Sequence, residues 1–161
     1  MFSFLLQDIP LNTPDMEGMT VLQAALEWGP PGEGKEAIVH NLLNSGASPN
    51  VQSPGSMYLY PIVAATFMDG VAANSKGQQP MDMLEKELLA AGAWVSVTDG
   101  AGNSPLHYAA KYSLYDVSDW LIQAGAKVSQ QNSDGKTPLD LAVDGKIIKL
   151  LKANGARETA K

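Results

Sequence analysis

The sequence predicts an all-α repeat solenoid, in which units of helix, turn, helix and hairpin stack side by side. A six-residue phrase occurs three times, with a degenerate fourth copy, and a second phrase precedes each copy. The composition agrees with a folded domain, because 45% of the 161 residues are hydrophobic and 17% are charged. Sequence repeats on this scale are typical of architectures in which each unit packs only against its neighbours.

The first phrase consists of two long apolar residues, two further residues and then Gly-Ala. It ends at Gly46-Ala47, Gly92-Ala93 and Gly125-Ala126, and the degenerate copy ends at Gly155-Ala156. We expect the apolar pair to lie late in the second helix of each unit and to face the core. Gly46, Gly92 and Gly125 should then end that helix, since glycine readily adopts the left-handed conformation.

The second phrase marks the start of the first helix in each unit. It occupies residues 20–25, 60–65, 104–109 and 137–142. In the third and fourth copies a proline follows Ser104 or Thr137. Proline at the first helical position loses no intrahelical hydrogen bond, and a serine or threonine before it caps the free N–H groups. Thr137 is therefore expected to be the helix cap of the fourth unit.

Together the two phrases resemble the ankyrin repeat, whose pattern is Thr-Pro-Leu-His-x-Ala followed by Leu-Leu-x-x-Gly-Ala. The third copy is the closest match, and the step of 33 from Ser104 to Thr137 equals the family's period. The resemblance implies four repeats, at about 16–52, 53–98, 99–131 and 132–156, between an N-terminal capping segment (1–15) and a frayed tail (157–161). It also implies that His107 is structural, with its ring bonded to backbone groups of neighbouring turns.

Two of the copies carry extra residues between their helices. The first copy has about 5 more than the third, near 29–34, and the second has about 11 more, around 70–80. Extra residues in a solenoid must lie outside the packed stack, so we expect two loops on one rim. Loops on a rigid scaffold often carry function, but tolerated surface insertions explain them equally well.

Alignment of the copies places large apolar residues in one column near the end of the first helix. Trp28, Met68 and Tyr112 share this column, and Phe67 lies beside it. An exposed row of this kind would suit the centre of a protein interface. The alternative is that the inserted loops fold over the row and bury it.

Five further residues are candidate partner contacts. Trp94 begins a hairpin segment, Tyr58 lies near a hairpin tip, and Tyr108 occupies a variable position of its helix. Asp82 and Glu85 are three residues apart and should share a helix face. That face is either an acidic docking patch or simply a solvated surface.

Charge and composition exclude several classes of function. With no cysteine and two histidines, the sequence offers no metal site and implies no cofactor. A net charge of −6 argues against nucleic acid and anionic membranes. Residues 1–99 hold 11 acidic and 3 basic residues, which would attract a protein with a basic surface. No apolar run is long enough to span a membrane, so we expect a cytoplasmic protein.

The resemblance implies a non-enzymatic module for protein–protein recognition, monomeric when free. The leading specific hypothesis is a small inhibitor or neutralising partner, such as the immunity protein of a bacterial toxin. The alternative is an adaptor or host-directed effector that grips a target without inhibiting it. A third hypothesis is a small-molecule binder or enzyme that uses a pocket between the two inserted loops.

Overall fold

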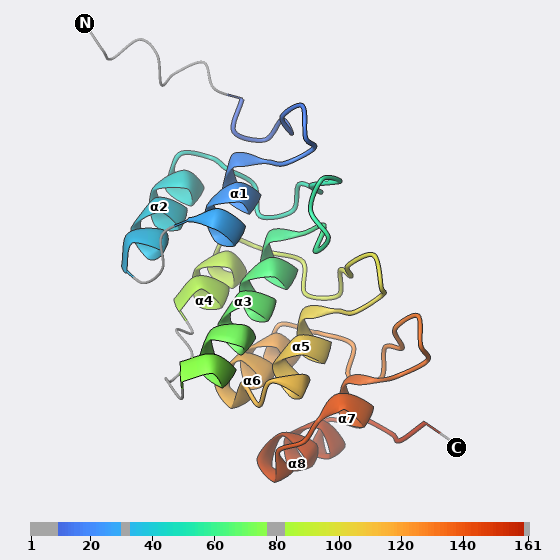
Figure 1. The fold of residues 1–161 in the computed structure, drawn as a ribbon. Helices are drawn as coiled ribbons and strands as arrows, with labels where there is room; N and C mark the ends of the chain where they lie inside the picture. The colour runs from blue at the N-terminus through green and yellow to red at the C-terminus, as the bar shows by residue number, and fades with distance from the viewer. Residues whose placement is uncertain (1–9, 30–32, 77–82, 160–161) are drawn as a thin grey trace, which may run out of the picture.

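The protein is a stack of four helix pairs (Figure 1). The structure, a computed structural model, describes residues 10–29, 33–76 and 83–159. The helices of the described residues are α1 (Val21–Trp28), α2 (Glu33–Asn44), α3 (Pro61–Lys76), α4 (Met83–Ala90), α5 (Pro105–Lys111), α6 (Tyr115–Gln123), α7 (Pro138–Leu141) and α8 (Gly145–Ala153). The predicted all-helical repeat solenoid is confirmed for this part of the chain. None of its helices combines the length and the apolar character needed to cross a membrane.

The helix starts follow from local capping. Thr20 accepts a hydrogen bond from the backbone N–H of Gln23 at 3.2 Å, and Asp144 accepts one from the N–H of Lys146 at 2.7 Å. At Thr137 the cap is reciprocal, because its hydroxyl accepts from the N–H of Asp140 while its own N–H donates to the Asp140 carboxylate. Such caps satisfy N–H groups that have no partner within the helix.

The second helix of each pair ends as the sequence predicts. Gly46, Gly92, Gly125 and Gly155 all have φ between +83° and +97°. The N–H of the alanine after each glycine bonds back to a carbonyl five residues earlier, for example from Ala93 to Leu88 at 2.9 Å. This closure uses carbonyls that the end of the helix would otherwise leave free.

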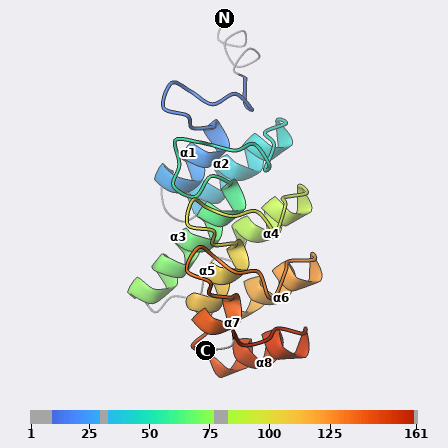
Figure 2. The same cartoon turned by 90° about the vertical axis from the view of Figure 1, so that its right-hand side faces the viewer.

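The pairs form two columns with the hydrophobic core between them (Figures 1 and 2). The inner helices α1, α3, α5 and α7 form one column, and the outer helices α2, α4, α6 and α8 form the other. Fully buried leucines and isoleucines from both columns meet in the core, which is continuous from the first repeat to the last. Burial of each such side chain contributes about 1.5–3 kcal/mol relative to exposure.

Hairpin segments project from one edge of the stack and contact one another. In three of these hairpins one side-chain oxygen accepts two backbone N–H bonds. The acceptor is Asp15 in the first hairpin, Asp99 in the third and Asn132 in the fourth. Between hairpins, the N–H of Gly55 donates to the carbonyl of Gly18 at 3.0 Å. Hydrogen bonds from asparagine side chains also join successive units.

This pattern uses asparagine and occurs twice. The Asn12 amide donates to the carbonyl of Gly46 at 3.0 Å, and its oxygen accepts from the N–H of Ser48 at 2.6 Å. Asn50 makes the same two bonds to Gly92 and Trp94, at 2.9 and 2.8 Å. Asn12, which precedes α1, therefore bonds the first repeat in the same way as Asn50 of the first repeat bonds the second. The expectation that residues 1–15 cover the open end concerns mainly residues 1–9, which lie outside the described part.

The prediction of a loop over residues 70–80 is wrong for its first half. Helix α3 continues to Lys76 and has 16 residues, whereas the corresponding α5 has 7. The residues from Met68 to Lys76 extend the helix beyond the position that matches the end of α5, and no proline among them interrupts the backbone bonding. Similarly, α2 begins at Glu33, inside the expected loop 29–34. The remainders, 30–32 and 77–82, lie outside the described residues.

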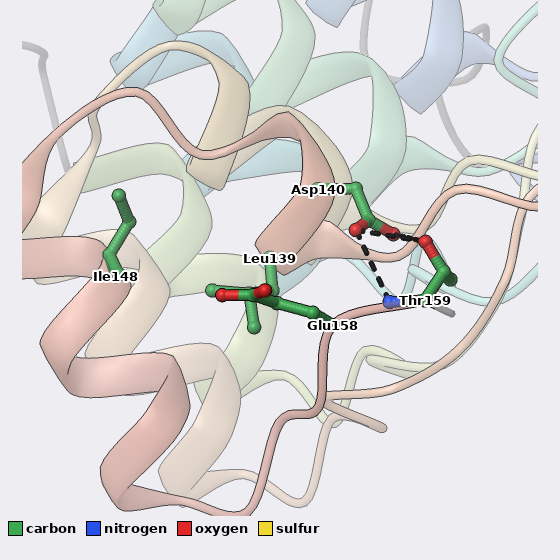
Figure 3. Close-up of a pocket in the computed structure, with 5 residues that line it drawn as sticks. All are labelled: Leu139, Asp140, Ile148, Glu158 and Thr159. Carbon is green, nitrogen blue, oxygen red and sulfur yellow. Dashed lines mark hydrogen bonds between the residues drawn. The ribbon is translucent and has the colours of Figure 1, made fainter. Parts of the chain in front are cut away.

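The prediction of a frayed tail is also wrong as far as Thr159. This segment lies back against the last inner helix, where the Thr159 hydroxyl is 3.1 Å from both carboxylate oxygens of Asp140 (Figure 3). Glu158 pairs with Lys152 at 2.9 Å. A hollow of about 470 Å³ remains between the tail and the last repeat, lined by Leu139, Asp140, Ile148, Glu158 and Thr159. Hydrogen bonding to Asp140 holds this segment against the last repeat.

Candidate protein-binding surface

Four aromatic side chains of the second and third repeats form one group, which we call the aromatic cluster. Tyr58 lies before α3, Phe67 lies on α3, and Tyr108 and Tyr112 belong to α5 and its end. Phe67 is the centre of the group, with ring centroids 4.7 Å from Tyr58, 5.3 Å from Tyr108 and 6.0 Å from Tyr112. The edge-to-face contacts are a favoured geometry for aromatic rings, so the cluster is a packed unit.

A buried carboxylate anchors the cluster on the side of the third repeat. The Tyr108 hydroxyl donates to Asp99 at 2.5 Å, and the other oxygen of Asp99 accepts from the N–H groups of Ala101 and Asn103. Burial raises the pKa of Tyr108, and the bond and negative charge of Asp99 raise it further. The tyrosine therefore stays neutral and fixes the hairpin to α5.

A second carboxylate lies on the side of the first repeat. Glu27 of α1 accepts hydrogen bonds from the Gln23 amide at 2.6 Å and from the Ser56 hydroxyl. Gln23 also donates to Ser56 at 3.0 Å, which connects α1 to the second hairpin. Burial raises the pKa of Tyr58, and the charge of Glu27 adds to the effect. Negative charge therefore borders the aromatic cluster at both ends.

Four large apolar side chains of the first two repeats are exposed to solvent. Trp28 at the end of α1 is 66% exposed, Met57 in the second hairpin is 72% exposed, and Trp94 is 59% exposed. Met16 in the first hairpin is fully exposed. We call Met16, Trp28, Met57 and Trp94, together with the aromatic cluster, the inner surface.

The structure separates the predicted apolar row. Trp28 is exposed, but Phe67, Met68 and Tyr112 are half-buried against the core. The extension of α3 covers part of Tyr112. A Cβ on Gly70 would lie only 2.2 Å from the Tyr112 ring, so the helix passes directly over it. Tyr108 is half-buried as well.

Two predicted contact residues are buried and cannot touch a partner in this conformation. Tyr58 is only 6% exposed, because Phe67 covers its ring. Glu85 is completely buried, which is incompatible with an acidic docking patch formed with Asp82. Asp82 itself lies outside the described residues. The repeat alignment could have predicted the burial of Glu85. Glu85 lies as far before Gly92 as Val39 lies before Gly46 and Ser118 before Gly125, and Val39 and Ser118 are also buried.

The histidine of the third repeat ties two hairpins together. The His107 ring is fully buried, and its Nδ1 accepts a hydrogen bond from the Ser104 N–H at 3.0 Å. Its Nε2 is 3.0 Å from the carbonyl oxygen of Lys136 in the next hairpin, to which it donates. His40, by contrast, is exposed on α2 and bonds Glu87 and Asn44.

Sequence reasoning missed three features of this surface. Met16, Glu27 and Asp99 were not candidates, although Glu27 precedes Trp28 directly and Asp99 occupies a hairpin position rich in turn formers. Met16 gave a weaker signal, as an apolar residue between two acidic ones. In the described ranges no three histidine, aspartate or glutamate side chains come together as a metal site would require.

A family model described as ankyrin repeats in three copies matches residues 71–161, more than half of the chain. Similar segments occur in the transient receptor potential cation channel subfamily A member 1 of Homo sapiens (35% identical over 66 residues) and its Caenorhabditis elegans homolog (39% over 62). The Mus musculus ankyrin repeat and SOCS box protein 9 is 38% identical over 71 residues.

These matches cover part of each protein. They span 39%, 38% and 43% of this chain, but only 6%, 5% and 24% of the three relatives. The chain thus spans less than a quarter of the relatives that it matches. Repeats of this type form protein–protein interaction modules and are generally not enzymes. The family model and the four stacked helix pairs agree: the chain belongs to the ankyrin repeat family.

Proposed function

We propose that this chain binds and neutralises another protein by occupying its surface, and that the partner presents a basic face. The observation that carries the proposal is the inner surface of the first two repeats, where Met16, Trp28 and Met57 are exposed. Exposed tryptophan and methionine suit the centre of an interface, where side chains become desolvated on binding. The monomeric state and the cytoplasmic location expected from the sequence remain predictions.

Charge supports the choice of a basic partner. Of the 17 acidic residues, 11 lie within residues 1–99, together with only 3 of the 11 basic ones. Long-range attraction of this kind accelerates encounter and weakens with salt. The packed aromatic cluster and the two hydrogen-bonded carboxylates beside it, Glu27 and Asp99, make the surface rigid before binding, which lowers the entropic cost of association.

An adaptor that grips a target without inhibiting it is the second candidate. The observation that favours it is the coverage of the relatives, in which matching repeats form a small part of a long protein. A neutraliser should abolish the activity of its partner, whereas an adaptor should leave that activity intact. A small-molecule pocket between the inserted loops would involve residues 30–32 and 77–82, which the structure does not describe.

The experiment is affinity capture from native lysate with the full chain as bait, at low and moderate salt. We expect one stoichiometric basic partner, whose activity is then measured with increasing amounts of this chain. Trp28→Ala should weaken that complex by at least about 2 kcal/mol, the threshold for a hot spot. Val143→Ala, which shortens an exposed apolar side chain of the fourth repeat, is the control. Equal affinity of the Trp28 variant and the unmodified chain would contradict the proposed surface.

A further inference from the structure

A second surface lies on the opposite side of the molecule from the hairpins. A groove of about 390 Å³ runs between the outer helices α6 and α8 of the last two repeats. Its lining residues are Tyr115, Lys146, Lys149, Leu150 and Ala153. None of them belongs to the inner surface, and both helices are in the outer column (Figure 2). We call it the outer groove.

The floor of the outer groove is apolar. Lys146, Lys149, Leu150 and Ala153 are spaced i, i+3, i+4 and i+7, so they share one face of α8. Leu150 is half-buried and Ala153 is exposed, while Tyr115 at the start of α6 supplies the other wall and is 42% exposed. Within the described residues no hydrogen bond engages the Tyr115 hydroxyl.

Two cations flank this floor. Neither Lys146 nor Lys149 forms an ion pair with any described carboxylate, although both side chains are exposed. The nearby acidic groups are occupied: Asp144 accepts backbone N–H bonds at the start of α8, and Glu158 pairs with Lys152. The two ammonium groups are therefore available one helical turn apart.

The surrounding charge selects the class of ligand. Asp116 and Asp119 lie on α6 beside Tyr115, and the whole chain carries −6. A nucleic acid or an anionic membrane would meet these carboxylates, and such polyanions need many clustered cations. A short segment with only two carboxylates meets much less of this repulsion than a polyanion does, and its two charges complement Lys146 and Lys149.

We propose that the outer groove binds an acidic segment of a partner protein. One apolar side chain of that segment enters between Tyr115 and Leu150, and two carboxylates about one helical turn apart pair with Lys146 and Lys149. The proposal goes beyond the inner surface and does not depend on it. The chain would then hold two proteins at once, one on each side and of opposite charge.

The test uses a fluorescein-labelled synthetic helical peptide with two glutamates three residues apart and a leucine on the same face. Fluorescence anisotropy should show binding to the full chain that weakens as salt rises. Lys149→Glu should weaken binding by about tenfold or more, a change typical of a lost charge pair. Lys127→Glu changes the net charge equally at an exposed lysine outside the groove, and should alter affinity by less than about twofold.

A second variant separates the groove from simple charge attraction. Ala153→Arg adds a positive charge but fills the floor, so it should weaken peptide binding. Three outcomes would overturn the proposal. The first is stronger peptide binding by Ala153→Arg, and the second is an equal loss of affinity in Lys149→Glu and Lys127→Glu. The third is no measurable binding of the peptide to the unmodified chain. Unchanged thermal midpoints show that the variants fold.

Two other occupants are outcomes of the same experiment. Sedimentation that shows self-association, lost in Lys149→Glu, would assign the groove to a second copy and overturn the proposal. Tighter binding of a DNA duplex than of the peptide, again lost in this variant, would also overturn it. Trp28→Ala should bind the peptide normally, so failure of the inner surface and failure of the outer groove are distinguishable.

Discussion

The buried histidine of the third repeat shows how one side chain can determine a local conformation. His107 has no exposed surface, and its two nitrogens bond different elements, Ser104 at the helix start and Lys136 in the next hairpin. Because Nδ1 accepts from an N–H group, the proton of the neutral ring must be on Nε2. The ring thus has one tautomer and one orientation.

Replacement of His107 by alanine should lower the free energy of unfolding by about 2–4 kcal/mol, since it leaves a cavity and two buried backbone groups without partners. Urea denaturation measures this. The matched control is His40→Ala, which removes an exposed histidine and its surface pair with Glu87, and should cost less than about 1 kcal/mol. A similar loss in both variants would contradict the role assigned to His107.

The same histidine should make stability depend on pH. Burial lowers the pKa of His107 below its ordinary value of 6.5, so the unfolded chain binds the proton more readily than the folded chain. The free energy of unfolding should therefore fall as the pH drops below about 6.5. The advantage of the wild-type chain over His107→Gln should shrink between about pH 7.5 and 5, measured by urea denaturation at each pH. A constant difference would mean that folding leaves the pKa of the His107 ring unchanged.

At the scale of elements, the longest helix determines how two repeats fit. Helix α3 extends beyond the length of its counterpart α5, and Gly70 in this extension lies against the Tyr112 ring. Only a residue without a side chain allows this approach, because a Cβ there would be 2.2 Å from the ring. The aromatic cluster is covered as a result.

Gly70→Ala should destabilise the protein by about 1–2 kcal/mol, because overpacking outweighs the better helix propensity of alanine. Thermal and urea unfolding measure this. In Gly70→Ala/Tyr112→Ala the ring is gone, so the combined loss should be smaller than the sum of the two single losses. Gly100→Ala is the control, since nothing lies within 4 Å of its added Cβ. Additive losses would show that the close contact does not limit stability.

Local chemistry explains which elements could be predicted from the sequence. The starts of α5 and α7 follow from Ser104, Thr137 and the prolines after them, and the outer helices end where glycine permits it. These signals act within a few residues. Glu85 and Tyr58 were predicted to be exposed but are buried. For Glu85, a spacing of three residues shows that two side chains share a helix face, but not whether that face points to solvent or to the core. For Tyr58, burial depends on Phe67, which covers its ring.

The extension of α3 was missed for a related reason. Residues between Gly70 and Lys76 include glycine, asparagine and serine, which are typical of loops. The contact with Tyr112, 42 positions further along the chain, is not visible in that local composition. The outer groove was likewise hidden, because α6 and α8 are separated in sequence by a hairpin and α7.

For the whole molecule, stability should vary along the stack. Among the described helices, the second and third repeats pack against a helix pair on both sides, whereas the fourth packs against one pair and has an inner helix, α7, of only 4 residues. In solenoids each unit draws its stability from adjacent units. The bond between Thr159 and Asp140 adds a contact between the tail and the last repeat.

The bond also affects the Asp140 carboxyl itself. Burial would raise its pKa, but the hydrogen bonds from Thr137 and Thr159 together outweigh this and hold the pKa below its usual range. The contribution of this carboxylate to stability is therefore present at neutral pH and is lost only in acid.

Hydrogen exchange should accordingly be faster in α7 and α8 than in α5 and α6, as measured by mass spectrometry at neutral pH. Removal of residues 157–161 should accelerate exchange in α7 and leave α3 unchanged, because the described tail residues Glu158 and Thr159 bond Lys152 and Asp140 of the last repeat. Uniform protection along the chain would contradict this gradient and indicate that all four repeats unfold together.

The contact between Gly70 and Tyr112 has a consequence for how such a protein can change over evolutionary time. Ankyrin arrays diversify by gaining, losing or exchanging units, which requires each unit to fit any neighbour. Here the second repeat has a long helix that suits one particular ring on the third, and the third has a ring that needs a glycine opposite. The two units have become a matched pair, so a duplication or exchange that separates them would require compensating changes on both sides of the new junction.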